Sequence, residues 1–161
     1  MIARTVATMG GIGLLPKAPG TWASAAAVPA AWLLHWAGGF ALLAAATVLV
    51  TALGWWATAQ IVKGDEDPSE IVVDEVVGMW LALWPLSLGL TAAGAAAHVF
   101  PWPGWVGGFL LFRLFDILKP PPVNWCERAG GAAGVMLDDL AAGALAAVLV
   151  TLAAGVAHGW F

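Results

Sequence analysis

Charged residues are scarce in this sequence, and tyrosine is absent from it. Asp, Glu, Lys and Arg together make up 10% of the 161 residues, whereas about 25% is usual in a soluble domain. Hydrophobic residues make up 61%, and the mean hydropathy is +0.89. This composition excludes a soluble globular domain and a disordered chain. The net charge of −4 leaves no basic face for a polyanion, which excludes a nucleic-acid partner.

Cysteine is nearly absent too, because Cys126 is the only one in the sequence. One thiol has no partner within the chain, so an intrachain disulfide framework is excluded. Tryptophan, in contrast, occurs 11 times. Since Trp favours the boundary between a membrane and water, the composition indicates an integral membrane protein.

Three uncharged stretches, residues 18–62, 76–112 and 140–161, make up most of the chain. Since a membrane-spanning helix needs about 20 apolar residues, they have room for two, two and one spans. We therefore predict one all-α domain over residues 1–161, an integral membrane bundle of about five transmembrane helices after an interfacial N-terminal segment. The spans are expected at residues 22–37, 40–62, 69–91, 105–119 and 139–158, with a turn at Gly38-Gly39.

All the charged residues fall on one side of this predicted bundle. The segments expected on the other side, residues 38–39, 92–104 and 159–161, carry no charge. Because Lys and Arg are enriched in cytoplasmic loops, the charged side is predicted to face the cytoplasm and the C-terminus to lie outside. Acidic residues contribute little to orientation, so their clustering on the same side needs another explanation.

Two pairs of adjacent acids lie next to apolar segments. The run Asp67-Pro68-Ser69-Glu70 is typical of a helix N-terminus, which predicts a helix from about residue 68 with Asp74 and Glu75 two turns into it. Asp138 and Asp139 are predicted to open the last helix. Each pair is explained either by capping at the membrane interface or by a functional site.

Arg113, Asp116 and Lys119 follow one another at intervals of three residues, so they share one helical face. At a rise of 1.5 Å per residue, Arg113 is expected roughly 9 Å deeper in the membrane than Lys119. Charges at such depth are costly unless paired, and they mark functional sites by default. The alternative is an Arg113–Asp116 ion pair that fastens the bundle, which is compatible with function.

A glycine-rich loop, residues 10–24, leads into the first span and contains Lys17, Thr21 and Ser24. The backbone N–H groups of such a loop can bind a phosphate, although no Walker pattern is present. The alternative for Thr21 is that it caps the following helix. Oxygen-rich acids without Cys or His suit Mg²⁺, with Mn²⁺ as the second candidate, and the neighbouring cations suit a phosphate. Together they predict phosphoryl chemistry on a lipid head group.

Four blocks of the sequence carry most of these polar residues: Pro19-Gly20-Thr21-Trp22-Ala23-Ser24, Ile71-Val72-Val73-Asp74-Glu75-Val76-Val77-Gly78-Met79-Trp80, Phe112-Arg113-Leu114-Phe115-Asp116-Ile117-Leu118-Lys119-Pro120 and Gly134-Val135-Met136-Leu137-Asp138-Asp139. These blocks resemble those of the phosphatidylglycerophosphatase A family, in the family's order and over nearly the whole chain. Two departures, Pro121 after Lys-Pro and Ala132 before Asp-Asp, are expected to lie in a connecting loop. The resemblance implies a small bacterial inner-membrane enzyme, dependent on Mg²⁺, that hydrolyses phosphatidylglycerophosphate to phosphatidylglycerol at the cytoplasmic face.

The interpretation as a metal-dependent lipid phosphatase assigns roles to ten residues. The predicted metal ligands are Asp74, Glu75, Asp116, Asp138 and Asp139, and all of these except Asp138 are also predicted to be catalytic. The predicted phosphate ligands are Lys17, Thr21, Ser24, Arg113 and Lys119. The expected partners are the lipid substrate and the bilayer, and no oligomeric state is assigned.

Several alternatives stay open from the sequence. The main one is a small membrane transporter or channel that uses the intramembrane charges as an ion path. A structural subunit and another lipid phosphatase or phosphotransferase are the others. Hydrolysis itself has two routes, by a metal-activated water or through an aspartyl-phosphate.

Overall fold

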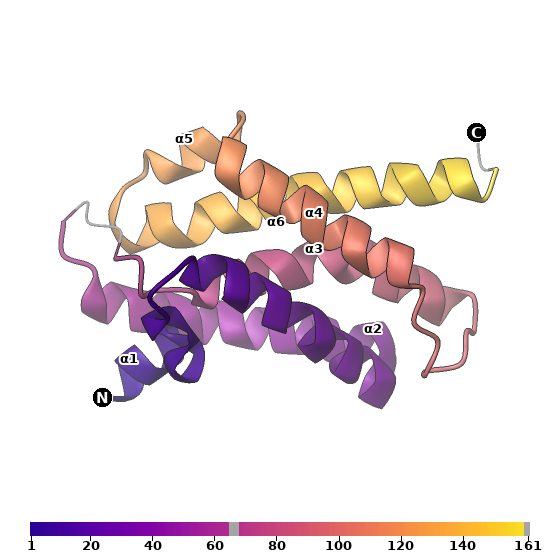
Figure 1. Cartoon of the computed structure of the whole chain (residues 1–161), viewed down its shortest axis with the longest axis horizontal. Coiled ribbons are helices and arrows are strands. Elements are labelled where there is room, and N and C mark those ends of the chain that lie inside the picture. The colour runs from indigo at the N-terminus through magenta and orange to yellow at the C-terminus, as the bar shows by residue number, and fades with distance from the viewer. Residues whose placement is uncertain (65–67, 160–161) are drawn as a thin grey trace.

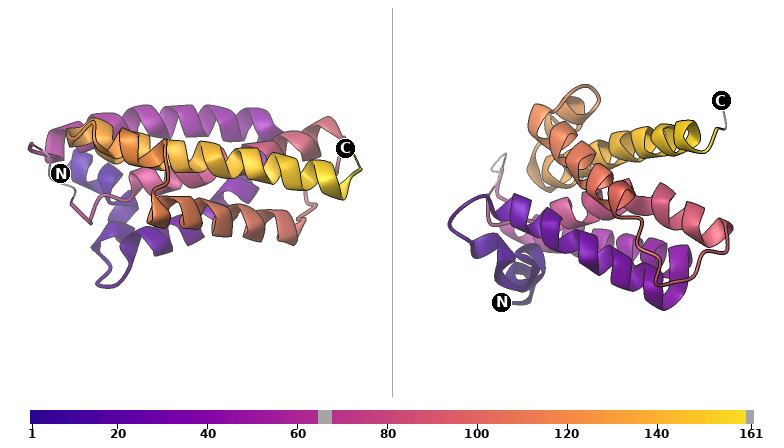
Figure 2. Two further views of the ribbon diagram at one scale, coloured as in Figure 1. Left: turned by 90° about the horizontal axis from the view of Figure 1, so that it is seen from above. Right: turned by 45° about the vertical axis from the view of Figure 1, so that its right-hand side comes forward.

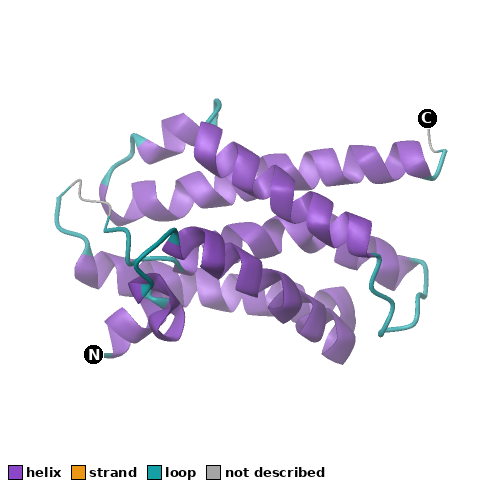
Figure 3. Cartoon of the chain, in the orientation of Figure 1, coloured by secondary structure: helices purple, strands orange, loops and turns teal. Residues whose placement is uncertain are grey.

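The computed structural model describes residues 1–64 and 68–159, and in these residues every regular element is a helix (Figure 3). The predicted all-α fold is therefore confirmed. The elements, shown in Figure 1, are α1 (Ile2–Ala7), the 3₁₀ helix η1 (Met9–Leu14), α2 (Pro19–Ile61), α3 (Val73–Ala92), α4 (Trp102–Leu118), α5 (Val123–Glu127) and α6 (Gly131–Ala157).

Helix α2 is interrupted at Gly38 and Gly39, whose backbone angles are not helical. Gly39 has φ 62°, a conformation that is easy only for glycine. Phe40 follows, and its N–H donates to the Thr91 hydroxyl at 3.1 Å, which ties this point to the end of α3. Figure 1 shows the chain turning back here, so the predicted turn at Gly38-Gly39 is confirmed.

Helix α3 is the central helix, and it packs against α2, α4 and α6. It contacts α6 closely because both helices have glycine at the crossing. A Cβ at Gly78 would lie 2.5 Å from the carbonyl oxygen of Asp139, and a Cβ at Gly143 would overlap the carbonyl of Gly78. Small residues of this kind let helix backbones approach in membrane proteins. In the left view of Figure 2, which is seen from above, α6 lies in front of α3.

Among the described residues, three helices are long and apolar enough to cross a membrane: α2, α3 and α6. Helix α4 has 17 residues, which at 1.5 Å per residue is about 26 Å and slightly short of a usual span. It begins at Trp102 rather than at the predicted residue 105, because Pro103 is tolerated in a first helical turn. Its predicted end near Lys119 is confirmed.

Helix α3 begins at Val73, so the predicted start near residue 68 is wrong. The N–H of Ile71 donates to Pro68 in a turn, and the N–H of Val72 donates to Ala7 of α1 at 2.9 Å. The backbone N–H groups of Ile71 and Val72 therefore bond to a turn and to α1, so they are not part of a helix. Asp74 and Glu75 consequently lie in the first turn of α3, not two turns into it, while the predicted cap Asp67 lies outside the described residues.

Helix α6 begins at Gly131, so the prediction that Asp138 and Asp139 open the last helix is also wrong. A Cβ at Gly134 would lie only 2.7 Å from the carbonyl oxygen of Glu127. Glycine at this position therefore lets the extra turns of α6 pass close to α5. The two aspartates lie about two turns into α6, because a turn takes 3.6 residues.

Candidate functional site

A cavity of about 290 Å³ lies at the end of the bundle where α2 and α3 begin and α4 ends. It is lined from four helices that are far apart in the sequence. Eight of the ten predicted site residues line it: Thr21, Asp74, Glu75, Arg113, Asp116, Lys119, Asp138 and Asp139. The fold therefore brings together most of the chemistry that the sequence pattern predicted.

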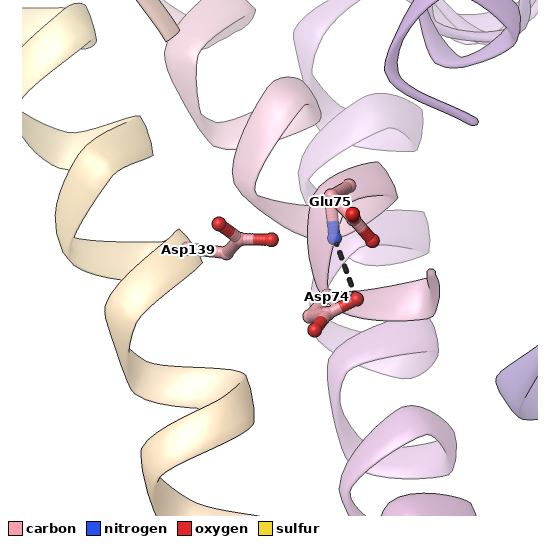
Figure 4. Close-up of side chains that lie close together, drawn as sticks. All are labelled: Asp74, Glu75 and Asp139. Atoms are coloured by element: carbon pink, nitrogen blue, oxygen red, sulfur yellow. Dashed lines mark hydrogen bonds between the residues drawn. The ribbon is translucent and has the colours of Figure 1, made fainter. Parts of the chain in front are cut away.

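Three of the acids form a compact cluster. Asp74 and Glu75 lie on α3, and Asp139 projects toward them from α6 (Figure 4). Each contributes a carboxylate oxygen, and these oxygens all lie within 4.8 Å of one another. Asp74 is only 7% exposed and Asp139 only 4%. Buried like charges at this separation are unfavourable unless a cation or protons offset them, so the cluster fits a cation.

Short local hydrogen bonds orient one acid in each adjacent pair. The backbone N–H of Glu75 donates to Asp74 Oδ1 at 3.0 Å, and that of Asp139 donates to Asp138 Oδ1 at 2.8 Å. Bonds of this kind between neighbouring residues compete with helical geometry and restrict the side-chain rotamers. The carboxylates are therefore held in place before any ligand binds.

The carboxylate of Glu75 packs against the first turn of α2. A Cβ at Gly20 would overlap Glu75 Oε1, so glycine is required for the helix to approach the carboxylate. The other oxygen, Glu75 Oε2, is buried, and within the described chain it has no hydrogen-bond partner. Buried polar atoms are nearly always paired, so this oxygen is aimed at a ligand site.

Arg113 crosses the cavity between α4 and α2. Its Nη1 donates to Asp116 Oδ2, and its Nη2 donates to the Thr21 hydroxyl at 3.2 Å. The alternative Arg113–Asp116 ion pair is thus confirmed. The N-cap of α2 is Ala18, so the alternative that Thr21 caps this helix is wrong. Thr21 instead holds the guanidinium, whose buried Nε has no partner in residues 1–64 and 68–159.

Lys119 ends α4 in a left-handed conformation, with φ 45° and ψ 53°. Its Nζ donates to Asp138 Oδ2 at 2.8 Å and to Glu127 Oε1 at 2.6 Å. Burial alone would lower the pKa of this ammonium, but the hydrogen bonds and negative charges of Asp138 and Glu127 outweigh burial and raise it. Lys119 therefore stays a cation. Sequence reasoning missed Glu127, because nothing in its local pattern connects it to Lys119.

Lys17 and Ser24 lie outside the cavity lining. Ser24 is buried, and its hydroxyl donates to the carbonyl oxygen of Gly20 at 2.8 Å. Lys17 is exposed in the loop before α2, beside Trp22. The predicted loop over residues 10–24 is wrong beyond Ala18, because α2 begins at Pro19. Gly20 and Thr21 line the site from the first turn of α2, and neither Lys17 nor Ser24 lines the cavity.

The fold and the site together define a class of protein: an apolar helical bundle with a cavity of carboxylates and cations at one end. Comparison with known proteins makes this specific. The family model described as Phosphatidylglycerophosphatase A matches residues 5–154, and the chain belongs to this family of phosphatases. The predicted resemblance is confirmed.

Three curated relatives cover most of the chain. Phosphatidylglycerophosphatase A of Escherichia coli K12 is 33% identical over 153 residues, which is 93% of this chain and 80% of the relative. The Haemophilus influenzae protein of the same name is 33% identical, over 87% and 81%. A putative phosphatidylinositol-3-phosphatase of Bacteroides thetaiotaomicron is 38% identical, over 89% and 87%. The comparison with solved structures gave no match.

Proposed function

We propose that this protein hydrolyses the phosphomonoester of phosphatidylglycerophosphate to phosphatidylglycerol and phosphate. Two of the three relatives carry this activity in their names. The observation that carries the proposal is the cavity itself, where a cluster of acids faces Arg113 and Lys119. Acids suit a divalent cation and the two basic groups suit phosphate oxygens, so the lining matches a phosphomonoester and a metal together.

Mg²⁺ fits the acid cluster, with Mn²⁺ as the second candidate. Asp74, Glu75 and Asp139 are the residues that would hold it, since their oxygens converge and Glu75 Oε2 has no partner among the described groups. All three are hard oxygen ligands of the kind that Mg²⁺ prefers. When bound, the metal supplies Lewis-acid activation of the phosphoryl group and positive charge for the acids.

The remaining two predicted acids have a different role in this proposal. Asp116 pairs with Arg113 and Asp138 pairs with Lys119, so both acids orient the cations that bind the phosphate. The predicted set of five metal ligands is thereby reduced to a core of three. Arg113 offers a planar fork of donors for phosphate oxygens, and Lys119 offers a point charge nearer the cavity mouth.

In the hydrolysis, a water oxygen forms a bond to phosphorus while the bond from phosphorus to the glycerol oxygen breaks. Asp74 or Glu75 accepts the proton of the attacking water, and solvent water supplies the proton that the leaving glycerol oxygen takes up. Arg113 and Lys119 offset the charge on the phosphoryl oxygens as it redistributes. The aspartyl-phosphate route is the alternative, and it would be revealed by a phosphorylated protein intermediate.

The proposed membrane arrangement has five passes, with the site at the cytoplasmic face of the bacterial inner membrane. The reversal at Gly38-Gly39 supports two passes for α2, and α3, α4 and α6 supply one each. Helices α1 and η1 then form the interfacial segment. Charged residues line the cavity at one end of the bundle, which supports placing the site at one face of the membrane. A transporter is less well supported, because an ion path needs polar groups along its whole length.

The second candidate substrate is phosphatidylinositol-3-phosphate, which the name of the Bacteroides relative favours. Both lipids carry a phosphomonoester, so the same acids and cations would serve either one. The test is phosphate release from each lipid by the purified protein in detergent micelles, with EDTA, Mg²⁺ or Mn²⁺ added. We expect turnover of phosphatidylglycerophosphate with Mg²⁺ and none with EDTA. Faster release from the inositol lipid, or full activity in EDTA, would overturn the proposal.

A further inference from the structure

Glu127 lies beside the candidate site without lining the cavity. It belongs to the short helix α5, and its Oε1 accepts a hydrogen bond from Lys119 Nζ at 2.6 Å. The same ammonium reaches Asp138 Oδ2 at 2.8 Å. The side chains are 50% exposed for Glu127, 27% for Lys119 and 9% for Asp138, so the three groups run from the surface to the interior.

A lysine ammonium has three N–H donors, and two acceptors from two different helices occupy two of them here. The long lysine side chain loses considerable rotamer freedom when it is fixed in one place. A second acceptor, on a different helix from Asp138, reduces the positions open to the ammonium before substrate arrives. The remaining donor is then left for a group in the cavity that Lys119 lines.

We propose that Glu127 is a positioning residue that acts through Lys119 and so determines how tightly the site binds a phosphate group. This rests on the proposed function, in which Lys119 binds a phosphate oxygen. Glu127 restrains the ammonium at the cavity mouth, and the loop through α5 places Glu127 there. Because Lys119 holds the phosphate in both the bound substrate and the transition state, Glu127 influences KM more than kcat.

Two other roles for Glu127 make different predictions. If Glu127 only fastens α5 to the bundle, its loss affects stability and leaves the kinetics of the folded protein unchanged. If Glu127 competes with phosphate for Lys119, its loss tightens binding and lowers KM. The positioning role alone predicts a higher KM that depends on the presence of Lys119.

The test compares Glu127→Ala, Glu127→Gln and Glu127→Asp, with Arg128→Gln as a matched change of charge on the neighbouring residue. KM and kcat are measured for phosphatidylglycerophosphate in micelles. We expect Glu127→Ala to raise KM about tenfold, with kcat changed by about twofold or less. Glu127→Gln retains an acceptor oxygen and should raise KM less, and Arg128→Gln should match the wild type.

A double-mutant cycle with Lys119→Ala decides whether Glu127 acts through Lys119. We expect Glu127→Ala to add nothing further to KM in the Lys119→Ala protein. An equal effect in both backgrounds, an unchanged KM, or a lower KM in Glu127→Gln would overturn the inference. Far-UV circular dichroism of each variant checks folding, and Glu127→Gln serves if Glu127→Ala does not fold.

Equilibrium binding of inorganic phosphate distinguishes a failure of this inference from a failure of the proposed substrate. We expect wild-type protein to bind phosphate more tightly than Glu127→Ala, by about the same factor as the change in KM. If the protein does not hydrolyse phosphatidylglycerophosphate but shows this order of phosphate affinities, the proposed substrate is wrong and the inference stands. Equal phosphate affinities in the two proteins would contradict the inference directly.

Discussion

The two pairs of adjacent acids look alike in the sequence and differ in the structure. Asp74 and Glu75 lie in the first turn of α3, and both line the cavity as parts of the acid cluster. Asp138 and Asp139 lie two turns into α6 and divide their roles, because Asp138 bonds Lys119 while Asp139 faces the acids of α3. Neighbouring residues on a helix point about 100° apart, so an adjacent pair can serve two sites.

The largest expected effect separates the acids of the cluster from the acid that holds Lys119. Asp74→Asn and Asp139→Asn remove charge with little change of size, and we expect kcat to fall on the order of 10²- to 10⁴-fold. Asp138→Asn should lower kcat/KM by only about tenfold, since it acts through Lys119. Phosphate release measures all three, and the control is Glu70→Gln, at an acid that pairs with Arg4 and does not line the cavity. Equal losses in Asp138→Asn and Asp139→Asn would remove the distinction.

Arg113 and Asp116 distinguish a phosphate-binding role from a purely structural pair. Arg113→Ala leaves the carboxylate of Asp116 without its partner, which should destabilise the protein by about 3–5 kcal/mol. Arg113→Ala combined with Asp116→Ala should recover much of that stability but stay inactive. Thermal unfolding in detergent and phosphate release are measured side by side. Recovery of turnover in the double variant would assign the pair to structure alone.

A smaller effect is expected from substituting a glycine at the crossing of α3 and α6, the two helices that carry the acid pairs. Gly78→Ala places a Cβ against the carbonyl of Asp139, and we expect a loss of about 1–3 kcal/mol in stability together with reduced activity. Gly107→Ala on α4 is the matched control, because no atom lies within 4 Å of its Cβ. That control should be neutral or stabilising by up to about 1 kcal/mol. If the two variants unfold at the same temperature, the crossing is looser than described.

The smallest expected effect concerns Lys17, a predicted phosphate ligand outside the cavity lining, in comparison with Thr21, which lines the cavity. Lys17→Ala should change KM by about twofold or less, because the exposed side chain does not line the site. Thr21→Val removes the hydroxyl that accepts from Arg113, so a larger rise in KM, about threefold to tenfold, is expected. A stronger effect of Lys17→Ala than of Thr21→Val would restore the predicted role of Lys17.

Features that depend on neighbouring residues could be predicted from the sequence. The turn at Gly38-Gly39 and the end of α4 near Lys119 follow from glycine and proline, whose backbone preferences are strong. The i, i+3 spacing likewise predicted the contact between Arg113 and Asp116. The grouping of eight site residues followed from the charge pattern, since the segments expected at the other end of the bundle carry no charge.

Features that depend on distant contacts could not be predicted in this way. The start of α3 is decided by Val72, whose N–H donates to Ala7 of α1 rather than to a helical partner. The early start of α6 depends on how Gly134 passes Glu127. The hydrogen bond that Lys119 donates to Glu127 joins the end of α4 to α5 across a turn, and local patterns contain no signal for it. The single domain, the metal and the membrane orientation stay predictions.

The contact of Gly78 with Gly143 also has a consequence for how the protein responds to bilayer thickness. Helices in a bilayer that is too thin or too thick tilt or shift, at a modest cost for each ångström of mismatch. Backbones that touch cannot slide past each other without a clash, so α3 and α6 must tilt as one body. The separation of Asp74 from Asp139 is then independent of lipid chain length. Activity should respond to acyl length through α2 and α4, which carry Thr21 and Arg113, while the acid cluster keeps its geometry.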